Sequence, residues 1–363
     1  MNKNIVLFIR SMHIGGAEKQ SILLAIELSK HYDVFLVIMY KEGQLQKETK
    51  GFNNIFYLEG NILNKTLQLF FFLKKKKINH LFNFLPINNI IGSIIGKLVG
   101  VDYIYNGIRG SKIKSNVFKM KLQLYLSNYI SHKIISNSYK GKQTYSNYGY
   151  KKDKIVVIHN MVTDLLPLSS IRNDLKTKQN NKIKILTVGR FVSEKDYPTM
   201  FRSISELVSL TENLENIDWE LVVVGYGVLE HELRVLVKKY NLTSKVKFLH
   251  GKSININECY KMADIYLSTS IFEGMSNTIM EAMSMGLPVV STNAGDSSYL
   301  VKNNFNGFIC PIYDCKKISL NLFKLIKNQK LRRQFGGNSY RVIQKYFLKD
   351  IIISKYNDLI END

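Results

Sequence analysis

Short apolar segments alternate with longer amphipathic stretches along most of the chain, and this alternation restricts the folds open to it. Residues 4–9 read as a buried strand, residues 17–30 have helical spacing, and residues 34–39 read as a second strand. A glycine pair, Gly15 and Gly16, lies in the first connection. Strand, helix and strand in this order predict a βαβ unit, whose two strands pair in parallel.

The alternation continues in two series. Further strand patterns of the first series cover residues 104–106, 134–136 and 156–158. Those of the second series cover residues 184–188, 221–224, 246–249, 265–268 and 289–291. Between the series, residues 163–182 are polar and lose the periodicity, so they read as a linker. The sequence therefore predicts two doubly wound, Rossmann-like α/β halves.

The length of 363 residues also favours two hydrophobic cores, at roughly 150 residues per domain. We expect one domain at residues 1–165, a second at 182–340, and a C-terminal helix at 341–363, for which a return to the first domain is one option. Open parallel sheets bind ligands beyond the carboxyl ends of their strands. A site is therefore expected in a cleft between the two halves.

The net charge of +22 is concentrated in one part of the chain. Residues 61–150 hold fourteen lysines and arginines but a single acidic residue, Asp102. Within this region, residues 68–77 and 117–130 combine apolar residues with lysines; a core-facing helix with a solvated lysine end is the simpler interpretation of the first stretch. The charge predicts an anionic partner, and we expect peripheral attachment to an anionic membrane surface through residues 61–150.

Nucleic acid is the alternative partner for this charge. The sequence contains no helix-turn-helix, RNA-recognition or zinc-finger pattern, so we expect no nucleic-acid binding. Three cysteines, an odd and sparse set, fit a reducing compartment. The apolar N-terminal run is too short for a signal peptide. No run approaches the eighteen apolar residues that a membrane-spanning helix needs. These features predict a cytoplasmic protein, peripheral on the inner face of the cell membrane.

A loop with two carboxylates follows the strand predicted at residues 265–268. Glu273 lies in the loop, and Glu281 lies one turn into the next helix. Gly274 allows backbone to approach a ligand, and the N–H groups of residues 276–279 at the helix start attract anions such as phosphate. A carboxylate beside such a phosphate site is a poor ligand for phosphate but a good hydrogen-bond acceptor for the hydroxyls of a sugar. The alternative for Glu281 is a capping box with Thr278, in which it only satisfies a backbone donor.

Two cations lie at the carboxyl end of another predicted strand. Arg190 follows residues 184–188, and Lys195 precedes a helix that Asp196 can cap and Pro198 can begin. The arginine offers a planar fork of donors for phosphate oxygens, and the lysine offers a point charge. The simpler interpretation is two solvated cations on a surface loop. Because parallel strands end at one edge, we expect these cations near the glutamate loop.

Other motifs carry weaker signals. Gly225-Tyr226-Gly227 is either a fragment of a dinucleotide fingerprint or a tight turn, and His13, His159 and His250 are as readily structural as catalytic. No two aspartates are separated by one residue, so an Asp-x-Asp metal and diphosphate site is absent from the sequence. We therefore expect neither a metal ion nor a cofactor.

Taken together, these motifs resemble the donor domain of retaining glycosyltransferase family four, the glycosyl transferases group 1, which has the GT-B fold. The resemblance lies in Gly189-Arg190, Lys195, the Glu273 and Glu281 pair, and AMSMGLPVV at residues 282–290. Residues 15–18 are similar to the N-terminal loop of the family, and residues 157–160 to its interdomain stretch. The likeness runs from about residue 4 to residue 350 and is specific in the donor half.

The resemblance implies a transferase that moves a sugar from a nucleotide-sugar donor, with UDP favoured over GDP, to a lipid-linked or oligosaccharide acceptor in surface polysaccharide synthesis. Glu281 would accept ribose hydroxyls, and Glu273 would lie by the transferred sugar. Arg190 and Lys195 would neutralise the leaving diphosphate, so Glu273, Arg190 and Lys195 form the expected catalytic set. The remaining expected substrate contacts are Gly15, Gly16, Arg109, Gly274, Met275, Ser276, Asn277 and Thr278.

Two positions depart from the family pattern. Many members carry a histidine facing the sugar where residues 103–112 offer Asn106 and Arg109. Arg109 is a candidate for that place, but the role of the histidine does not transfer to it. Residues 293–301 lack the second glycine and the glutamate often found there, which leaves Asp296 as a weak candidate. A nucleotide-sugar epimerase of the same fold is the nearest alternative function.

Overall fold

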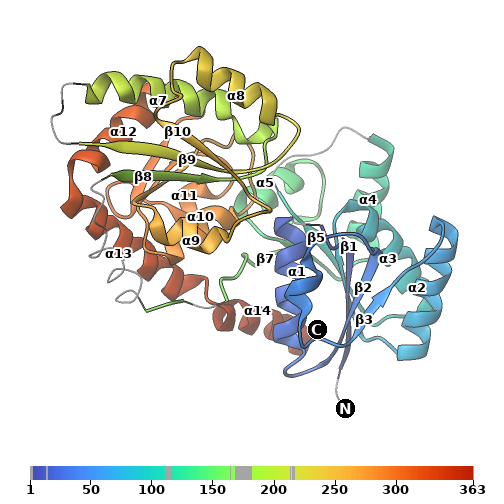
Figure 1. The fold of residues 1–363 in the computed structure, drawn as a ribbon. Helices are drawn as coiled ribbons and strands as arrows, with labels where there is room; N and C mark the ends of the chain where they lie inside the picture. Colours follow the sequence, from blue (N-terminus) through green and yellow to red (C-terminus); the bar gives the residue numbers. More distant parts are fainter. Residues whose placement is uncertain are drawn as a thin grey trace. The chain divides into compact units, whose positions relative to one another are not determined.

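The chain forms two compact units in a computed structural model that describes residues 3–13, 15–110, 117–163, 165–167, 182–212, 214 and 217–362 (Figure 1). The first unit comprises Met1–Thr163 and Lys349–Asp363, and the second comprises Asp164–Leu348. Most of the predicted linker at 163–182 lies outside the described residues.

The first unit contains a seven-stranded sheet in the order β3-β2-β1-β4-β5-β6-β7, with every neighbouring pair parallel. Its strands are β1 (Asn4–Ser11), β2 (Asp33–Tyr40), β3 (Ile55–Tyr57), β4 (His80–Phe84), β5 (Tyr103–Ile108), β6 (Lys133–Ser136) and β7 (Ile155–Val157). Its α-helices are α1 (Gly16–Leu28), α2 (Ile62–Lys76), α3 (Pro86–Val99), α4 (Val117–Tyr129), α5 (Tyr139–Asn147) and α14 (Lys349–Asn362), with short helices η1 (Leu45–Thr49) and η2 (Lys152–Lys154).

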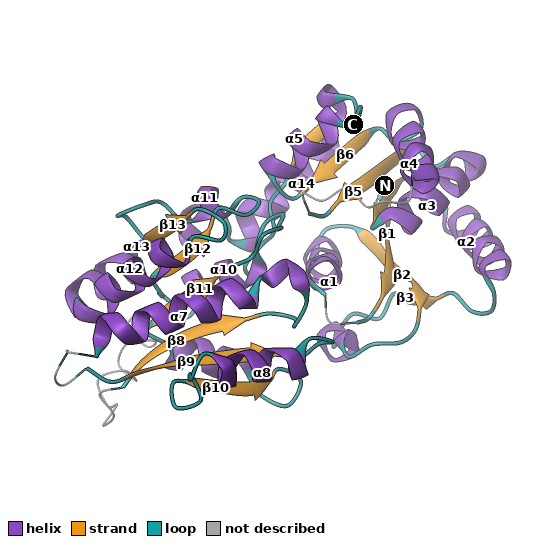
Figure 2. Ribbon diagram, turned by 90° about the horizontal axis from the view of Figure 1, so that it is seen from above, coloured by secondary structure: helices purple, strands orange, loops and turns teal. Residues whose placement is uncertain are grey.

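Two hydrophobic layers cover this sheet, because successive side chains of a strand point to opposite faces. Ile5 and Leu7 of β1 belong to a core that includes residues of α1 and α14. Val6 and Phe8 belong to a second core with residues of α2 and α3. Helices α2, α3 and α4 are neighbours in one layer (Figures 1 and 2).

The C-terminal helix predicted at 341–363 is divided in the structure. Helix α13 (Gln329–Tyr346) ends in the second unit, and α14 belongs to the first. Lys3 Nζ donates to the carbonyl of Ile360 at 2.6 Å, and the Tyr356 ring packs edge-on against Phe82 at 6.0 Å between centroids. Both contacts anchor α14 to the first sheet.

The second unit contains a six-stranded parallel sheet in the order β10-β9-β8-β11-β12-β13. Its strands are β8 (Ile183–Val188), β9 (Trp219–Gly225), β10 (Val246–His250), β11 (Ile265–Ser268), β12 (Val289–Thr292) and β13 (Gly307–Cys310). Its remaining helices are η3 (Ser193–Lys195), α7 (Tyr197–Thr211), α8 (Glu230–Lys239), α9 (Ile256–Met262), α10 (Asn277–Ser284), α11 (Ser297–Leu300) and α12 (Cys315–Lys327).

The predicted class, two Rossmann-like α/β domains with parallel sheets, is confirmed. Strands β3, β4 and β13 were not predicted. In β4 the apolar pattern is interrupted by His80 and Asn83, which are nevertheless buried. Their side chains pair with β5: His80 Nδ1 lies 3.2 Å from the Tyr105 hydroxyl, and Asn83 Nδ2 donates to Asn106 Oδ1 at 3.0 Å. A buried polar side chain is tolerated when such a partner is present.

Candidate functional site

The residues predicted to bind the donor lie at the carboxyl ends of β8 and β11, which are neighbours in the second sheet. Two connections tie the segments after these strands together. Thr269 Oγ1 donates to the carbonyls of Lys195 and Asp196 at 2.9 and 3.1 Å. The backbone N–H of Ile271 donates to the carbonyl of Glu194 at 2.9 Å. The two loops therefore form one structural group.

Lys195 and Glu273 form a direct ion pair. Lys195 Nζ lies 2.5 Å from Glu273 Oε1, and the two side chains are 21% and 16% exposed. Ser270 Oγ donates to the same carboxylate oxygen at 2.9 Å. Two donors on one oxygen hold the carboxylate in a single orientation, and partial burial limits its screening by water. The predicted proximity of these residues is a structural fact, whereas their catalytic roles stay a prediction.

The helix that follows Lys195 begins as the sequence predicts. Asp196 is the N-cap of α7, its side chain accepts from the N–H of Thr199 at 3.3 Å, and a proline occupies the first turn. The buried Tyr197 donates through its hydroxyl to the carbonyl of Gly189 at 3.1 Å. This bond joins the end of β8 to the start of α7 and so positions both cation-bearing segments.

Arg190 is exposed at the end of β8. The turn that follows β9 closes against this segment: Phe191 N–H donates to the Tyr226 carbonyl at 2.9 Å. A Cβ on Gly225 would lie 2.0 Å from the carbonyl oxygen of Gly189, so only glycine fits there. In Gly225-Tyr226-Gly227 the structure thus favours the tight-turn interpretation.

Glu281 is held by a residue distant in the sequence. Tyr260, on α9, donates through its hydroxyl to Glu281 Oε2 at 3.0 Å. Burial, and then the negative charge of Glu281, raises the pKa of Tyr260 well above its ordinary value, so this phenol stays a neutral donor. The capping-box alternative with Thr278 is wrong, because α10 has Ser276 as its N-cap and Thr278 lies inside the helix.

The loop between Glu273 and α10 is pinned by the segment after β12. Asp296 N–H donates to the carbonyl of Gly274 at 2.9 Å. Gly295 has φ +56°, and a Cβ there would lie 2.4 Å from the carbonyl oxygen of Glu273. Met275 and Ser276 are buried, and α10 starts without a side-chain cap, which suits an anion at its N-terminus.

The predicted site residues of the first unit lie at the carboxyl ends of β1 and β5. Gly15 is the N-cap of α1, and a Cβ there would lie 2.2 Å from Glu18 Oε2, so the Glu18 carboxylate lies against the helix start. Gly16 begins α1. Arg109 Nη1 donates to Asn160 Oδ1 at 3.1 Å, and its guanidinium lies 5.0 Å from the centroid of the Phe84 ring.

Comparisons with known proteins show which enzymes the chain is similar to. Residues 171–342 match the family model described as Glycosyl transferases group 1. The chain is similar to this family over most of its second unit. It is 28% identical to an uncharacterized glycosyltransferase of Haemophilus influenzae over 96% of this chain and 98% of that protein. It is 25% identical to the UDP-Gal:alpha-D-GlcNAc-diphosphoundecaprenol alpha-1,3-galactosyltransferase of Escherichia coli, over 83% of this chain and 80% of that protein.

A solved structure similar to this glycosyltransferase is Anabaena HepE in complex with UDP-glucose. The TM-score is 0.82 at 16% sequence identity, with 99% of this chain and 100% of the other covered. At this identity the likeness concerns the fold, and it agrees with the GT-B fold that the sequence predicts. The glycosyltransferase is thus built from two Rossmann-like domains of the GT-B type.

Three residues that organise the candidate site of the second unit were missed from the sequence. Ser270 and Gly295 follow strands β11 and β12, so their position at the carboxyl edge was a usable signal. Tyr260 gave no signal, because it lies on the helix before β11 and reaches Glu281 only in the folded domain.

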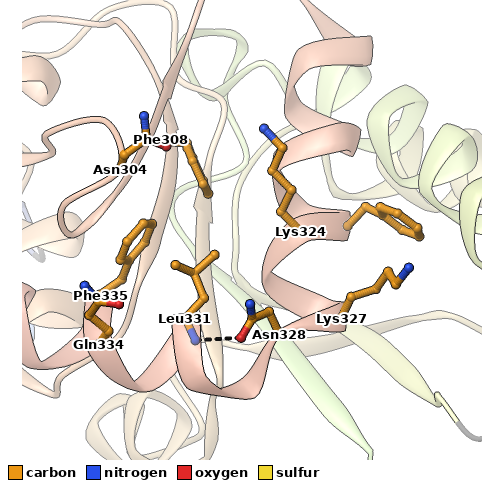
Figure 3. A pocket seen from close by; sticks show the side chains of 9 residues that line it. Asn304, Phe308, Lys324, Lys327, Asn328, Leu331, Gln334 and Phe335 are labelled. Carbon is orange, nitrogen blue, oxygen red and sulfur yellow. Dashed lines mark hydrogen bonds between the residues drawn. The ribbon is translucent and has the colours of Figure 1, made fainter.

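A pocket of the second unit lies away from the predicted site residues. A cavity of about 500 Å³ is lined by Asn304, Phe308, Phe323, Lys324, Lys327, Asn328, Leu331, Gln334 and Phe335 (Figure 3). None of the predicted site residues lines it. In the described part of the glycosyltransferase, no group of three or more His, Cys, Asp or Glu side chains is placed to hold a metal ion. No helix among the described residues has the length and apolarity to span a membrane.

Proposed function

We propose that this glycosyltransferase moves a sugar from a nucleotide-sugar donor, with UDP favoured over GDP, to a lipid-linked saccharide at the inner face of the cell membrane, with retention and without a metal ion. The observation that carries the proposal is the group of Lys195, Glu273 and Ser270 joined at the carboxyl edge of β8 and β11. Exposed Arg190 lies at the end of β8 in the same edge.

In the proposed reaction, the bond between the sugar C1 and the distal phosphate oxygen breaks as a bond from the acceptor oxygen to C1 forms on the same face. The acceptor proton passes to the departing phosphate oxygen, and the nucleoside diphosphate leaves. The Lys195 ammonium has three N–H donors, so it can maintain its ion pair with Glu273 and still donate a hydrogen bond to the diphosphate. Arg190 adds a planar cation, and fixed charges of this kind stabilise the developing negative charge.

Glu281 holds the ribose in this proposal, and Tyr260 orients its carboxylate. Two relatives support the choice of substrates. The name of the Escherichia coli relative specifies a UDP-sugar donor and a diphosphoundecaprenol-linked acceptor, and the HepE structure contains UDP-glucose.

The test is transfer of radiolabel from UDP-glucose, UDP-galactose or GDP-mannose to a GlcNAc-diphosphoundecaprenol acceptor. One UDP-sugar should label the lipid, and the product should keep the anomeric configuration of the donor, as measured by NMR. Lys195→Ala and Glu273→Gln should each lower kcat by about 100-fold, the usual scale for loss of a group that stabilises a developing charge. The matched control is Lys30→Ala, which removes an equally short Lys–Glu pair of 2.5 Å in the first unit.

The proposal is wrong if no UDP-sugar labels the lipid, or if Lys195→Ala and Lys30→Ala behave alike. Conversion of a UDP-sugar to its epimer without an acceptor would instead identify an epimerase. Binding can be tested separately by thermal shift with UDP, GDP and ADP. UDP at about 100 times its Kd should stabilise the wild type by about 2.7 kcal/mol, and Glu281→Ala should lose this stabilisation.

A further inference from the structure

The outward side of helix α2 is apolar. Its core side carries Leu69 and Leu73, which are fully buried, whereas Leu63, Leu67 and Phe71 repeat every four residues and are 64%, 47% and 64% exposed. Positions two residues from the buried series lie about 200° around the helix axis from it. A helix on the surface of a globular domain normally presents polar residues there.

The neighbouring helices also expose apolar side chains. Helix α3 exposes Ile94 and Leu98, and α4 exposes Phe118, Tyr125 and Tyr129. Helix α3 packs against both α2 and α4, so the three helices form one layer on the sheet (Figures 1 and 2). We call these exposed residues of α2, α3 and α4 the α2–α4 face. Exposed apolar residues gathered on one layer of a domain are typical of an interaction site.

The same helices also carry exposed lysines. The exposed lysines of the same helices are Lys74, Lys75, Lys76, Lys97, Lys119 and Lys121. Over residues 61–150 the chain has one acidic residue, Asp102, and it accepts a hydrogen bond from Asn79 at 2.9 Å. The α2–α4 face therefore combines aliphatic, aromatic and cationic side chains.

We propose that the α2–α4 face binds the surface of a bilayer rich in anionic lipid. Leucine and phenylalanine side chains enter the interfacial region, tyrosines lie at the headgroup level, and the lysines contact lipid phosphates. A second copy of this chain is a poorer occupant, because a symmetric contact would bring the lysines together. The inference rests on the proposed function, in which the acceptor is lipid-linked, and names the surface that reaches the lipid.

Co-sedimentation of the full chain with vesicles tests the surface. Wild type should bind vesicles of phosphatidylcholine with 30% phosphatidylserine and show little binding to phosphatidylcholine alone. At about 1 kcal/mol per lysine, the double variant Lys74→Gln/Lys75→Gln should bind roughly 30-fold more weakly. Leu67→Gln/Phe71→Gln should also weaken binding, and both variants should fold, because the four side chains are exposed.

The matched controls are Lys238→Gln/Lys239→Gln and Val235→Gln/Leu320→Gln, which change exposed residues of the second unit. Both should bind vesicles as wild type does. The proposal is overturned if the wild type does not bind the anionic vesicles, or if the α2 variants and the controls lose vesicle binding equally. It is also overturned if sedimentation shows that the wild type is a dimer and that Leu67→Gln/Phe71→Gln dissociates this dimer. Failure of transfer with vesicle binding intact refutes the proposed function alone, and transfer without vesicle binding refutes the α2–α4 face alone.

Discussion

Replacing Tyr260 with phenylalanine removes one hydroxyl from the second unit and leaves the packing of its ring unchanged. That hydroxyl donates to Glu281 Oε2 at 3.0 Å, while the ring is 1% exposed. Glu281 itself is only half-buried, so water can replace the lost donor. We therefore expect the variant to fold and to hold the Glu281 carboxylate less firmly.

The size of the effect follows from the type of hydrogen bond. Bonds to charged groups contribute about 1.5–3 kcal/mol, and access of water to Glu281 reduces the net loss to about 1 kcal/mol. If this loss appears in nucleotide binding, the Kd for UDP rises about fivefold. The unfolding free energy of the second unit should fall by about 1 kcal/mol at most, which lowers Tm by about 2–4 °C.

Isothermal titration calorimetry with UDP measures the first quantity, and differential scanning calorimetry measures the second. The matched control is Tyr32→Phe, which removes a phenol–carboxylate hydrogen bond of 2.9 Å to Glu361 in the first unit. It should leave the Kd for UDP unchanged. In a Glu281→Gln background, Tyr260→Phe should have a smaller effect on Kd, because the two groups act through one contact.

The reasoning is refuted if Tyr260→Phe binds UDP like wild type although Glu281→Ala does not bind. It is also refuted if Tyr32→Phe and Tyr260→Phe raise the Kd equally, since the effect would then not depend on Glu281.

Two further predictions concern the loop that contains Glu273 and Gly274 and the role of metal. Gly295→Ala should lower kcat/KM at least tenfold, because the new Cβ would lie 2.4 and 2.5 Å from the carbonyl oxygens of Glu273 and Gly274. The control is Gly100→Ala, because Gly100 has φ +81° but no atom lies within 4 Å of a Cβ built there. This control should change only the free energy of unfolding, by about 1–2 kcal/mol. Transfer from a UDP-sugar should stay within about twofold of its rate after dialysis against EDTA, because in the proposed mechanism Arg190 and Lys195 supply the positive charge at the diphosphate. A loss of rate that Mg²⁺ restores would contradict this metal-independent mechanism.

Much of the second unit could be predicted from the sequence because its signals are local. Asp196 and Pro198 mark the start of α7 within three residues of Lys195, and the strand pattern at 265–268 coincides with β11. The rule that parallel strands end at one edge then brings Lys195 and Glu273 together, as observed.

Predictions failed where a polar residue in the core found its partner on another strand. His80 and Asn83 obscured β4, although Tyr105 and Asn106 of β5 satisfy them. The capping-box interpretation of Glu281 failed for a related reason. It relied on residues three positions apart, whereas the carboxylate accepts from Tyr260, 21 residues away.

The sequence by itself determined the parallel α/β class and the edge at which the charged side chains gather, since both follow from periodicity and chain order. Only the tertiary structure decided which groups orient Glu273 and Glu281, and that the leucines and phenylalanine of α2 face outward beside those of α3 and α4. Hydrogen bonds and surfaces of this kind join segments far apart in the chain, and their geometry exists only once the sheets and helices have packed.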